Sequence, residues 1–348
     1  MRPPYKVLII DDSSLMRQLL TQILGSDPEL EVIGTAADPF VAREKIKSLN
    51  PDVLTLDIEM PRMDGLTFLE KLMRGHPMPV VMISSLTDRG AETTLRALSL
   101  GAVDYIAKPK VDVSNGTIEQ ASDIIAKVKA AAKVRVRGLE PGEIIPAAAL
   151  PAGYRFTATH KVVAIGASTG GTEALKDLLS ALPPDFPGVV MVQHMPEAFT
   201  RPFSERLNSL CRIHVQEAKD GDRILPGHAL LAPGGHQMQV VRRGTEYAVK
   251  VYRGERVNRH LPSVDVLFSS CARQLGKNAI GVLLTGMGSD GAKGMLEMKV
   301  AEAHTIAQDE ATCVVFGMPR EAIQLGAVDQ VLPLGRIPTA LLHRLGSA

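Results

Sequence analysis

Residues 6–12 read Lys-Val-Leu-Ile-Ile-Asp-Asp, a short apolar run that ends in two aspartates. Consecutive aliphatic side chains of this kind predict a buried strand. Ser13 follows as a candidate helix N-cap, and apolar residues then recur four apart at Leu15, Leu19 and Ile23. The stretch therefore predicts a strand, a turn that carries carboxylates, and an amphipathic helix.

The same alternation of strand and helix continues through the first 122 residues. Further strands are predicted at residues 31–34, 53–57, 80–84 and 105–107, with helical patterns between them. Five strands that alternate with helices indicate an α/β fold with a doubly wound parallel sheet. In such a sheet, ligands bind beyond the carboxyl ends of the strands.

The alternation is lost across residues 123–160, which are rich in Ala, Pro and Gly. This composition predicts an interdomain linker that is helical at its start. Strands are predicted again at residues 162–165, 189–193, 280–285 and 305–307, and residues 229–251 alternate as a hairpin does. We therefore expect one domain at residues 1–122, a linker at 123–160, and a second doubly wound α/β domain with an antiparallel hairpin at 161–348.

Length and charge agree with two ordinary globular domains. The chain has 348 residues, and domains of roughly 100–200 residues are usual. Its 39 Lys and Arg nearly balance its 38 Asp and Glu, which argues against a general nucleic-acid binder. The three scattered cysteines favour a reducing cytoplasm. No apolar run approaches the ~20 residues that span a bilayer, so we expect no direct membrane insertion.

Polar residues stand at the predicted strand ends of the first half. Asp11 and Asp12 follow the first strand, and Asp57 ends the third. Converging carboxylates repel one another unless a divalent cation lies among them, and oxygen ligands favour Mg²⁺. Ser84 and Lys108 end two further strands, and a hydroxyl and an ammonium suit a phosphoryl group. Each could be an ordinary loop residue, but together they predict a site for Mg²⁺ and phosphate.

Four segments of this half, VLIIDDSSLMR, LDIEMPRMDGL, MISSLT and GAVDYIAKP, resemble the receiver domain of two-component response regulators, which has a flavodoxin-like fold. The resemblance implies that a histidine kinase phosphorylates Asp57. It also implies that Asp12 and Asp57 bind Mg²⁺ together with the backbone carbonyl of Glu59, and that Asp11 acts through water.

The same resemblance assigns the residues that respond to the phosphoryl group. Ser84 takes the place of the switch hydroxyl, with the adjacent Ser85 as an alternative. Lys108 contacts the acyl phosphate, and Tyr105 is the switch aromatic residue.

In the second half, residues 166–171 read Gly-Ala-Ser-Thr-Gly-Gly between a predicted strand and a helix. They fit G-x-S-x-G, a turn that presents a serine, although this motif by itself is more often a dinucleotide- or phosphate-binding loop or simply a tight turn. His194 follows the next strand, and Asp290 lies in a Gly-rich turn after a later one. Ser168, His194 and Asp290 could therefore meet at one sheet edge as nucleophile, base and orienting carboxylate. Their order in the chain differs from that of the α/β-hydrolases.

Other polar residues of this half have plainer interpretations. His228 and His236 flank the segment LLAPGG and are predicted to be exposed hairpin residues. Ser263 precedes a helical pattern, so its predicted role is to cap that helix.

Four segments, GASTGGTEAL, VVMVQHMP, HLPSVDVLF and LLTGMGSDGAKGM, resemble the catalytic domain of the CheB family of chemotaxis protein-glutamate methylesterases and glutamine deamidases. The resemblance implies that Ser168 is the nucleophile, His194 the general base and Asp290 the third triad member. Backbone N–H groups of Thr169 and Met287 would form the oxyanion hole.

The resemblance implies demethylation of glutamate γ-methyl esters, with release of methanol, and deamidation of glutamines on chemoreceptor signalling domains. The unphosphorylated receiver would cover the active site until a histidine kinase phosphorylates it. Mg²⁺ would serve the receiver, and hydrolysis would need no cofactor. We expect a cytoplasmic monomer. The alternative is a phosphorylation-controlled binding module without enzymatic activity; a transcription factor is disfavoured because the second half lacks a helix-turn-helix pattern and a basic patch.

Overall fold

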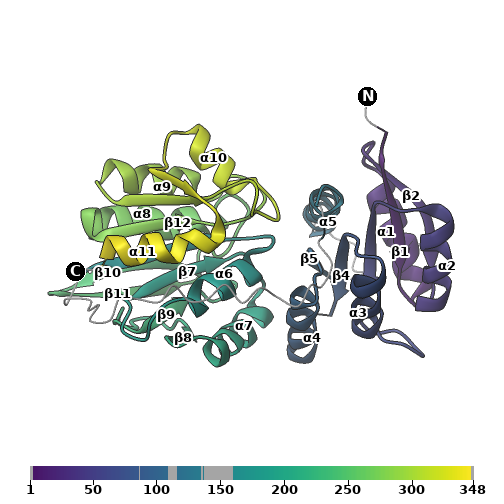
Figure 1. The fold of residues 1–348 in the computed structure, drawn as a ribbon, viewed down its shortest axis with the longest axis horizontal. Helices are drawn as coiled ribbons and strands as arrows, with labels where there is room; N and C mark the ends of the chain where they lie inside the picture. The colour runs from purple at the N-terminus through teal and green to yellow at the C-terminus, as the bar shows by residue number, and fades with distance from the viewer. Residues whose placement is uncertain (1–2, 86, 109–115, 135, 137–159, 346–348) are drawn as a thin grey trace. The chain divides into compact units, whose positions relative to one another are not determined.

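The computed structural model describes residues 3–85, 87–108, 116–134, 136 and 160–345. It divides into two compact units, Met1–Glu143 and Ile144–Ala348, and each contains a sheet covered by helices (Figure 1). Most of the predicted linker lies outside the described residues. Within the described ranges, no helix is both long enough and apolar enough to cross a membrane.

The first unit contains the predicted five-stranded parallel sheet, in the order β2-β1-β3-β4-β5. Its strands are β1 (Tyr5–Ile10), β2 (Leu30–Ala36), β3 (Val53–Asp57), β4 (Val80–Ser84) and β5 (Asp104–Ala107). Its helices are α1 (Ser14–Gly25), α2 (Pro39–Leu49), α3 (Gly65–Gly75), α4 (Asp88–Ser99) and α5 (Gly116–Ala132). Helix α1 begins where predicted, because the side chain of Ser13 accepts a hydrogen bond from the backbone N–H of Met16.

Helix α5 continues past residue 122, the predicted end of the first domain. It packs against α1 and against β3, β4 and β5. Ile124, Val128 and Ala131 are buried in this contact, so the start of the predicted linker contributes to the core of the first unit.

The second unit has a seven-stranded parallel sheet, in the order β14-β13-β12-β6-β7-β9-β8. Its strands are β6 (Val162–Ala167), β7 (Val189–Gln193), β8 (His214–Glu217), β9 (His228–Leu231), β12 (Ala279–Leu283), β13 (His304–Gln308) and β14 (Gln330–Leu332). A separate antiparallel hairpin joins β10 (Gln237–Arg243) to β11 (Glu246–Tyr252). The predicted hairpin is therefore present, but residues 228–231 belong to the parallel sheet instead.

Helices cover both faces of this second sheet (Figure 1). Those on one face are α8 (Val264–Leu275), α9 (Ala292–Val300) and α10 (Met318–Gln324), which pack together. Those on the other are α6 (Gly171–Ser180), α7 (Glu197–Leu210) and α11 (Ile337–Leu345). The core between sheet and helices includes four fully buried phenylalanines, Phe186, Phe199, Phe203 and Phe268.

Each sheet has a pair of neighbouring strands from which the chain proceeds toward opposite edges of the sheet. In the first sheet this pair is β1 and β3, and in the second sheet it is β6 and β12. Connections leave such a pair of strands on opposite faces, which opens a crevice at their carboxyl ends. The carboxylates of the first unit lie at the ends of β1 and β3, and Ser168, His194 and Asp290 follow β6, β7 and β12.

Candidate active site and phosphorylation pocket

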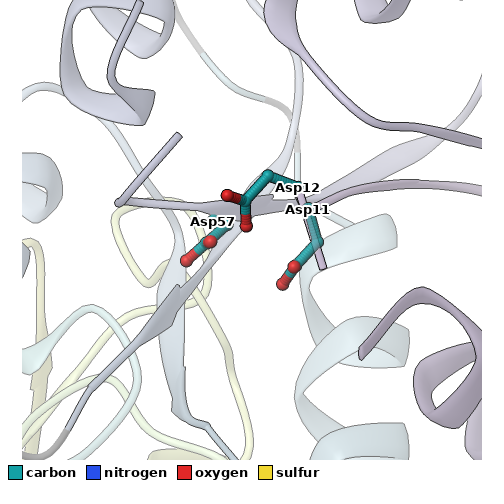
Figure 2. Close-up of side chains that lie close together, drawn as sticks. All are labelled: Asp11, Asp12 and Asp57. Carbon is teal, nitrogen blue, oxygen red and sulfur yellow. The ribbon is translucent and has the colours of Figure 1, made fainter. Parts of the chain in front are cut away.

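Three carboxylates converge at the carboxyl ends of β1 and β3. Oxygen atoms of Asp11, Asp12 and Asp57 all lie within 4.8 Å of one another, and Figure 2 shows the side chains close together at the strand ends. Asp11 and Asp57 are fully buried. The sequence prediction that these carboxylates converge is thus confirmed.

The residues of this cluster fit a divalent cation. Oδ2 of Asp11 is buried and has no hydrogen-bond partner among the described residues. Burial, and then the charge of Asp57, raise the pKa of Asp11 to about 6. Burial also raises the pKa of Asp57, although Lys108 opposes that rise. A cation among these oxygens would offset both the cost of burying the charged carboxylates and the repulsion between Asp11 and Asp57.

Lys108 reaches this cluster from the end of β5. Its Nζ lies 2.8 Å from Oδ1 of Asp57 and donates a hydrogen bond to Oδ2 at 2.9 Å. Burial opposes the charged form of Lys108, but the hydrogen bond and charge of Asp57 raise its pKa above the usual value. Glu59, two residues beyond Asp57, has an exposed side chain, and its backbone N–H donates to the Asp57 carboxylate.

The two switch candidates, Ser84 and Tyr105, each contact a helix. The buried hydroxyl of Ser84 accepts a hydrogen bond from Thr94 on α4 at 2.6 Å and donates to the carbonyl of Gly90 at 3.3 Å. Ser85 is half-buried and contacts Thr87 instead. Tyr105 is buried, with Nζ of Lys127 5.1 Å from its ring centre. In this state both predicted switch side chains contact helices.

In the second unit, Ser168 lies in the turn between β6 and α6. Gly170 ends this turn in a left-handed conformation at φ 76°, which glycine adopts without steric cost. A Cβ at Gly286, in the turn after β12, would lie 2.8 Å from Cβ of Ser168. The serine therefore packs directly against the Gly-rich turn of residues 286–291.

His194 follows β7 and its backbone N–H donates to the carbonyl of Ala167, next to Ser168, at 3.1 Å. Its Nε2 lies 2.8 Å from Oδ2 of Asp290. Its Nδ1 is buried and has no hydrogen-bond partner in the described part of the chain. The three predicted residues thus meet at one edge of the sheet, although no hydrogen bond joins Ser168 to His194 in this structure.

Asp290 is fully buried at the N-terminus of α8, where its carboxylate accepts several further hydrogen bonds. These come from Ser263 Oγ at 2.7 Å, Val264 N at 2.6 Å and Asn258 Nδ2 at 2.7 Å. Burial alone would raise the pKa of Asp290, but the hydrogen bond and charge of His194, with these other donors, hold it well below its usual range. The carboxylate is therefore ionised, so that it can orient and stabilise a charged imidazole.

Sequence reasoning missed the residues that surround His194 and Asp290. The rings of His194 and His260 stack, with centroids 3.6 Å apart and planes 8° from parallel. Ser263 occupies the N-cap position, but its side chain donates to Asp290 instead of capping the helix. His228 is half-buried in β9 beside His214, so its predicted place in an exposed hairpin is wrong. In the sequence, these contacts were indicated only by the polar residues of the segment HLPSVDVLF, which precede a predicted helix.

Comparison with known proteins agrees with this geometry. A family model described as CheB methylesterase matches residues 163–341, and a response regulator receiver domain model matches residues 7–115. This chain belongs to the CheB methylesterase family. It is 58% identical to protein-glutamate methylesterase/protein-glutamine glutaminase 1 of Geobacter metallireducens, over 99% of this chain and 97% of that protein.

Other CheB relatives give the same result. The methylesterase/glutaminase of Nitrosomonas europaea is 56% identical over 98% of this chain and 97% of its own length. The crystal structure of the Thermotoga maritima CheB methylesterase catalytic domain matches with a TM-score of 0.52 and 38% identity, over 54% of this chain and 100% of that one. Relatives of this similarity are named as enzymes, which does not favour the alternative of a non-enzymatic binding module.

Proposed function

We propose that this CheB-family enzyme hydrolyses glutamate γ-methyl esters and deamidates glutamines on chemoreceptors, with Ser168, His194 and Asp290 as a catalytic triad. The observation that carries this proposal is the 2.8 Å contact between His194 Nε2 and the ionised Asp290, beside a serine on a strand–turn–helix. We infer the activity from the names of the relatives, and the roles of the individual residues from the chemistry of the site.

The tautomer of His194 decides which nitrogen acts as the base. Asp290 accepts a hydrogen bond from Nε2–H, so the neutral ring keeps its lone pair on Nδ1. Nδ1 takes the proton of Ser168 as Oγ bonds to the acyl carbon. The protonated ring then gives that proton to the methoxy oxygen of the ester, or to the amide nitrogen of a glutamine, as its bond to the acyl carbon breaks, so that methanol or ammonia leaves. Water attacks the glutamyl-serine ester with Nδ1 again as base, which restores Ser168 and releases glutamate.

The negative oxygen of each tetrahedral intermediate needs hydrogen-bond donors. The N–H of Gly286 is committed to the carbonyl of Val315 at 3.0 Å. The next N–H, that of Met287, has no acceptor among the described residues, and Ser168 packs against this turn. Together with Thr169 at the start of α6, Met287 is suited to be an oxyanion donor.

The receiver pocket supports control by phosphorylation. Asp57 would accept the phosphoryl group from a histidine kinase, and Asp11, Asp12 and Asp57, with the carbonyl of Glu59, would hold Mg²⁺, which neutralises charge during transfer. Lys108 already contacts the Asp57 carboxylate and would contact the phosphoryl oxygens. Ser84 would leave Thr94 to reach them, and Tyr105 would follow.

We also propose the domain boundaries, the location and the oligomeric state of the protein. The receiver domain would extend through α5, which ends at Ala132, with the linker following it. The protein would act as a cytoplasmic monomer. Its catalytic domain would begin near Lys161.

The switch predicts the behaviour of Asp57→Asn. In wild type, a small-molecule phosphodonor should raise the rate of methanol release from membranes that contain methylated chemoreceptors. In Asp57→Asn the basal rate should remain within about twofold, and the donor should have no effect, because the amide accepts no phosphoryl group. Glu44→Gln, an exposed change on α2, is the control and should respond as wild type does. A normal response by Asp57→Asn would contradict the proposed switch.

Mg²⁺ removal should separate the switch from the hydrolysis. With EDTA in excess, the phosphodonor should no longer stimulate methanol release, because the Asp11–Asp57 repulsion opposes transfer of a further anionic group. Basal release should continue, since the proposed triad carries it. Added Mg²⁺ should restore the stimulation. Stimulation that survives EDTA would show that the carboxylate cluster does not need the cation.

A further inference from the structure

A tight turn connects the hairpin of the second unit to α8 at the edge of the active site. Val257 and His260 pair as an antiparallel bridge, with backbone hydrogen bonds of 3.0 and 2.9 Å in the two directions. The two residues between them, Asn258 and Arg259, both have positive φ, at 52° and 70°. Glycine or asparagine is usual at both positions of such a turn, so an arginine there costs backbone energy.

The residues on either side of Arg259 contact Asp290 and His194. Asn258 Nδ2 donates to Oδ1 of Asp290 and to Oδ2 of Asp265, each at 2.7 Å. On the other side, the ring of His260 stacks on that of His194. The turn is therefore held against the triad, and Arg259, which is exposed, lies at its tip.

Two more exposed arginines precede this turn. Arg253, Arg256 and Arg259 form no ion pair with any described residue. Nη1 of Arg256 donates to the carbonyl of Arg259 at 3.1 Å, so Arg256 stays beside the tip. Glu255 is the one acidic residue of this stretch, which leaves an excess of positive charge.

We propose that the arginine turn, residues 253–259, binds carboxylates that neighbour the scissile ester on the protein substrate. This rests on the proposed function, because the reaction itself defines the charge of the partner. Each turnover converts a neutral ester into a carboxylate, so a segment with several modifiable glutamates becomes acidic beside its remaining esters. Guanidinium groups without an ion pair, on a turn that contacts Asp290 and His194, attract such a segment and orient it by paired hydrogen bonds.

The test compares steady-state methanol release from methylated receptor membranes at low and high salt. Arg259→Gly removes the charge and also relaxes the turn, so the fold should not suffer. We expect its KM to rise about fivefold to tenfold at low salt with kcat within about twofold, and its KM to depend less on salt than that of wild type. Arg259→Lys keeps the charge and should recover most of the difference. Arg212→Glu is the control.

Arg212 suits that purpose because it is exposed and forms no ion pair with the described residues. It precedes β8, at the amino ends of the parallel strands, whereas the candidate active site lies at their carboxyl ends. An unchanged KM in Arg259→Gly, an equal rise in Arg212→Glu, or a rise that salt does not affect would each overturn the proposal, while wild-type turnover would leave the proposed function intact. Absence of methanol release by wild type would instead contradict the proposed function.

Discussion

Ser168→Ala should lower kcat for methanol release from methylated receptors by about 10⁴-fold or more. In the proposed reaction, Ser168 Oγ is the atom that bonds to the acyl carbon, so its removal leaves the reaction without its nucleophile. The stability should hardly change, because this hydroxyl is half-buried and makes no hydrogen bond with the described residues. The free energy of unfolding in urea should therefore stay within about 0.5 kcal/mol of wild type.

Ser289→Ala is the matched control for this variant. Ser289 is an exposed serine in the same turn as Asp290, so its hydroxyl is a second candidate for the nucleophile. We expect it to retain wild-type kcat. Full activity in Ser168→Ala, or loss of activity in Ser289→Ala alone, would show that the nucleophile has been assigned to the wrong residue.

Both candidate sites were predictable from the sequence for the same physical reason. The carboxyl ends of parallel strands share one edge of a sheet, and short turns keep the residue after each strand at that edge. Asp11 and Asp57 follow neighbouring strands, as do Ser168 and the turn that holds Asp290. Recognising the buried strands is therefore enough to predict that these side chains lie at the same edge of a sheet, even though they are far apart in the chain.

The residues that complete the active site could not be predicted in this way. Asn258 and His260 reach the proposed triad from a turn with positive φ at two non-glycine residues, a conformation that no local pattern indicates. Ser263 has the usual sequence of a helix cap, and only the tertiary fold shows that a carboxylate from another turn takes the hydrogen bonds of that helix end. Pairing of the short strands β8 and β9 is likewise non-local, which explains the misplaced hairpin boundary.

Asp290→Asn should have the second largest effect, a fall of about 10⁴-fold in kcat. Every group around the Asp290 carboxylate donates: Val264 N and His194 Nε2 to Oδ2, and Asn258 Nδ2 to Oδ1. An amide has an acceptor on one side only, so in either orientation its NH₂ faces a donor. If the NH₂ faces His194, the ring must take the other tautomer and Nδ1 is no longer a base.

The unsatisfied donors should also cost about 1–3 kcal/mol of stability, so the chemical effect must be separated from unfolding. Asp265→Asn is the control: Asp265 is buried at the same helix end, but it accepts from Gly294 N and Asn258 and does not contact His194. Its amide should also leave one donor unsatisfied, which gives a matched loss of stability, but the contact between His194 and Asp290 stays intact, so kcat should remain within about tenfold of wild type. If Asp290→Asn, folded at the assay temperature, released methanol as fast as Asp265→Asn, the pairing of His194 with Asp290 would not be what activates Ser168.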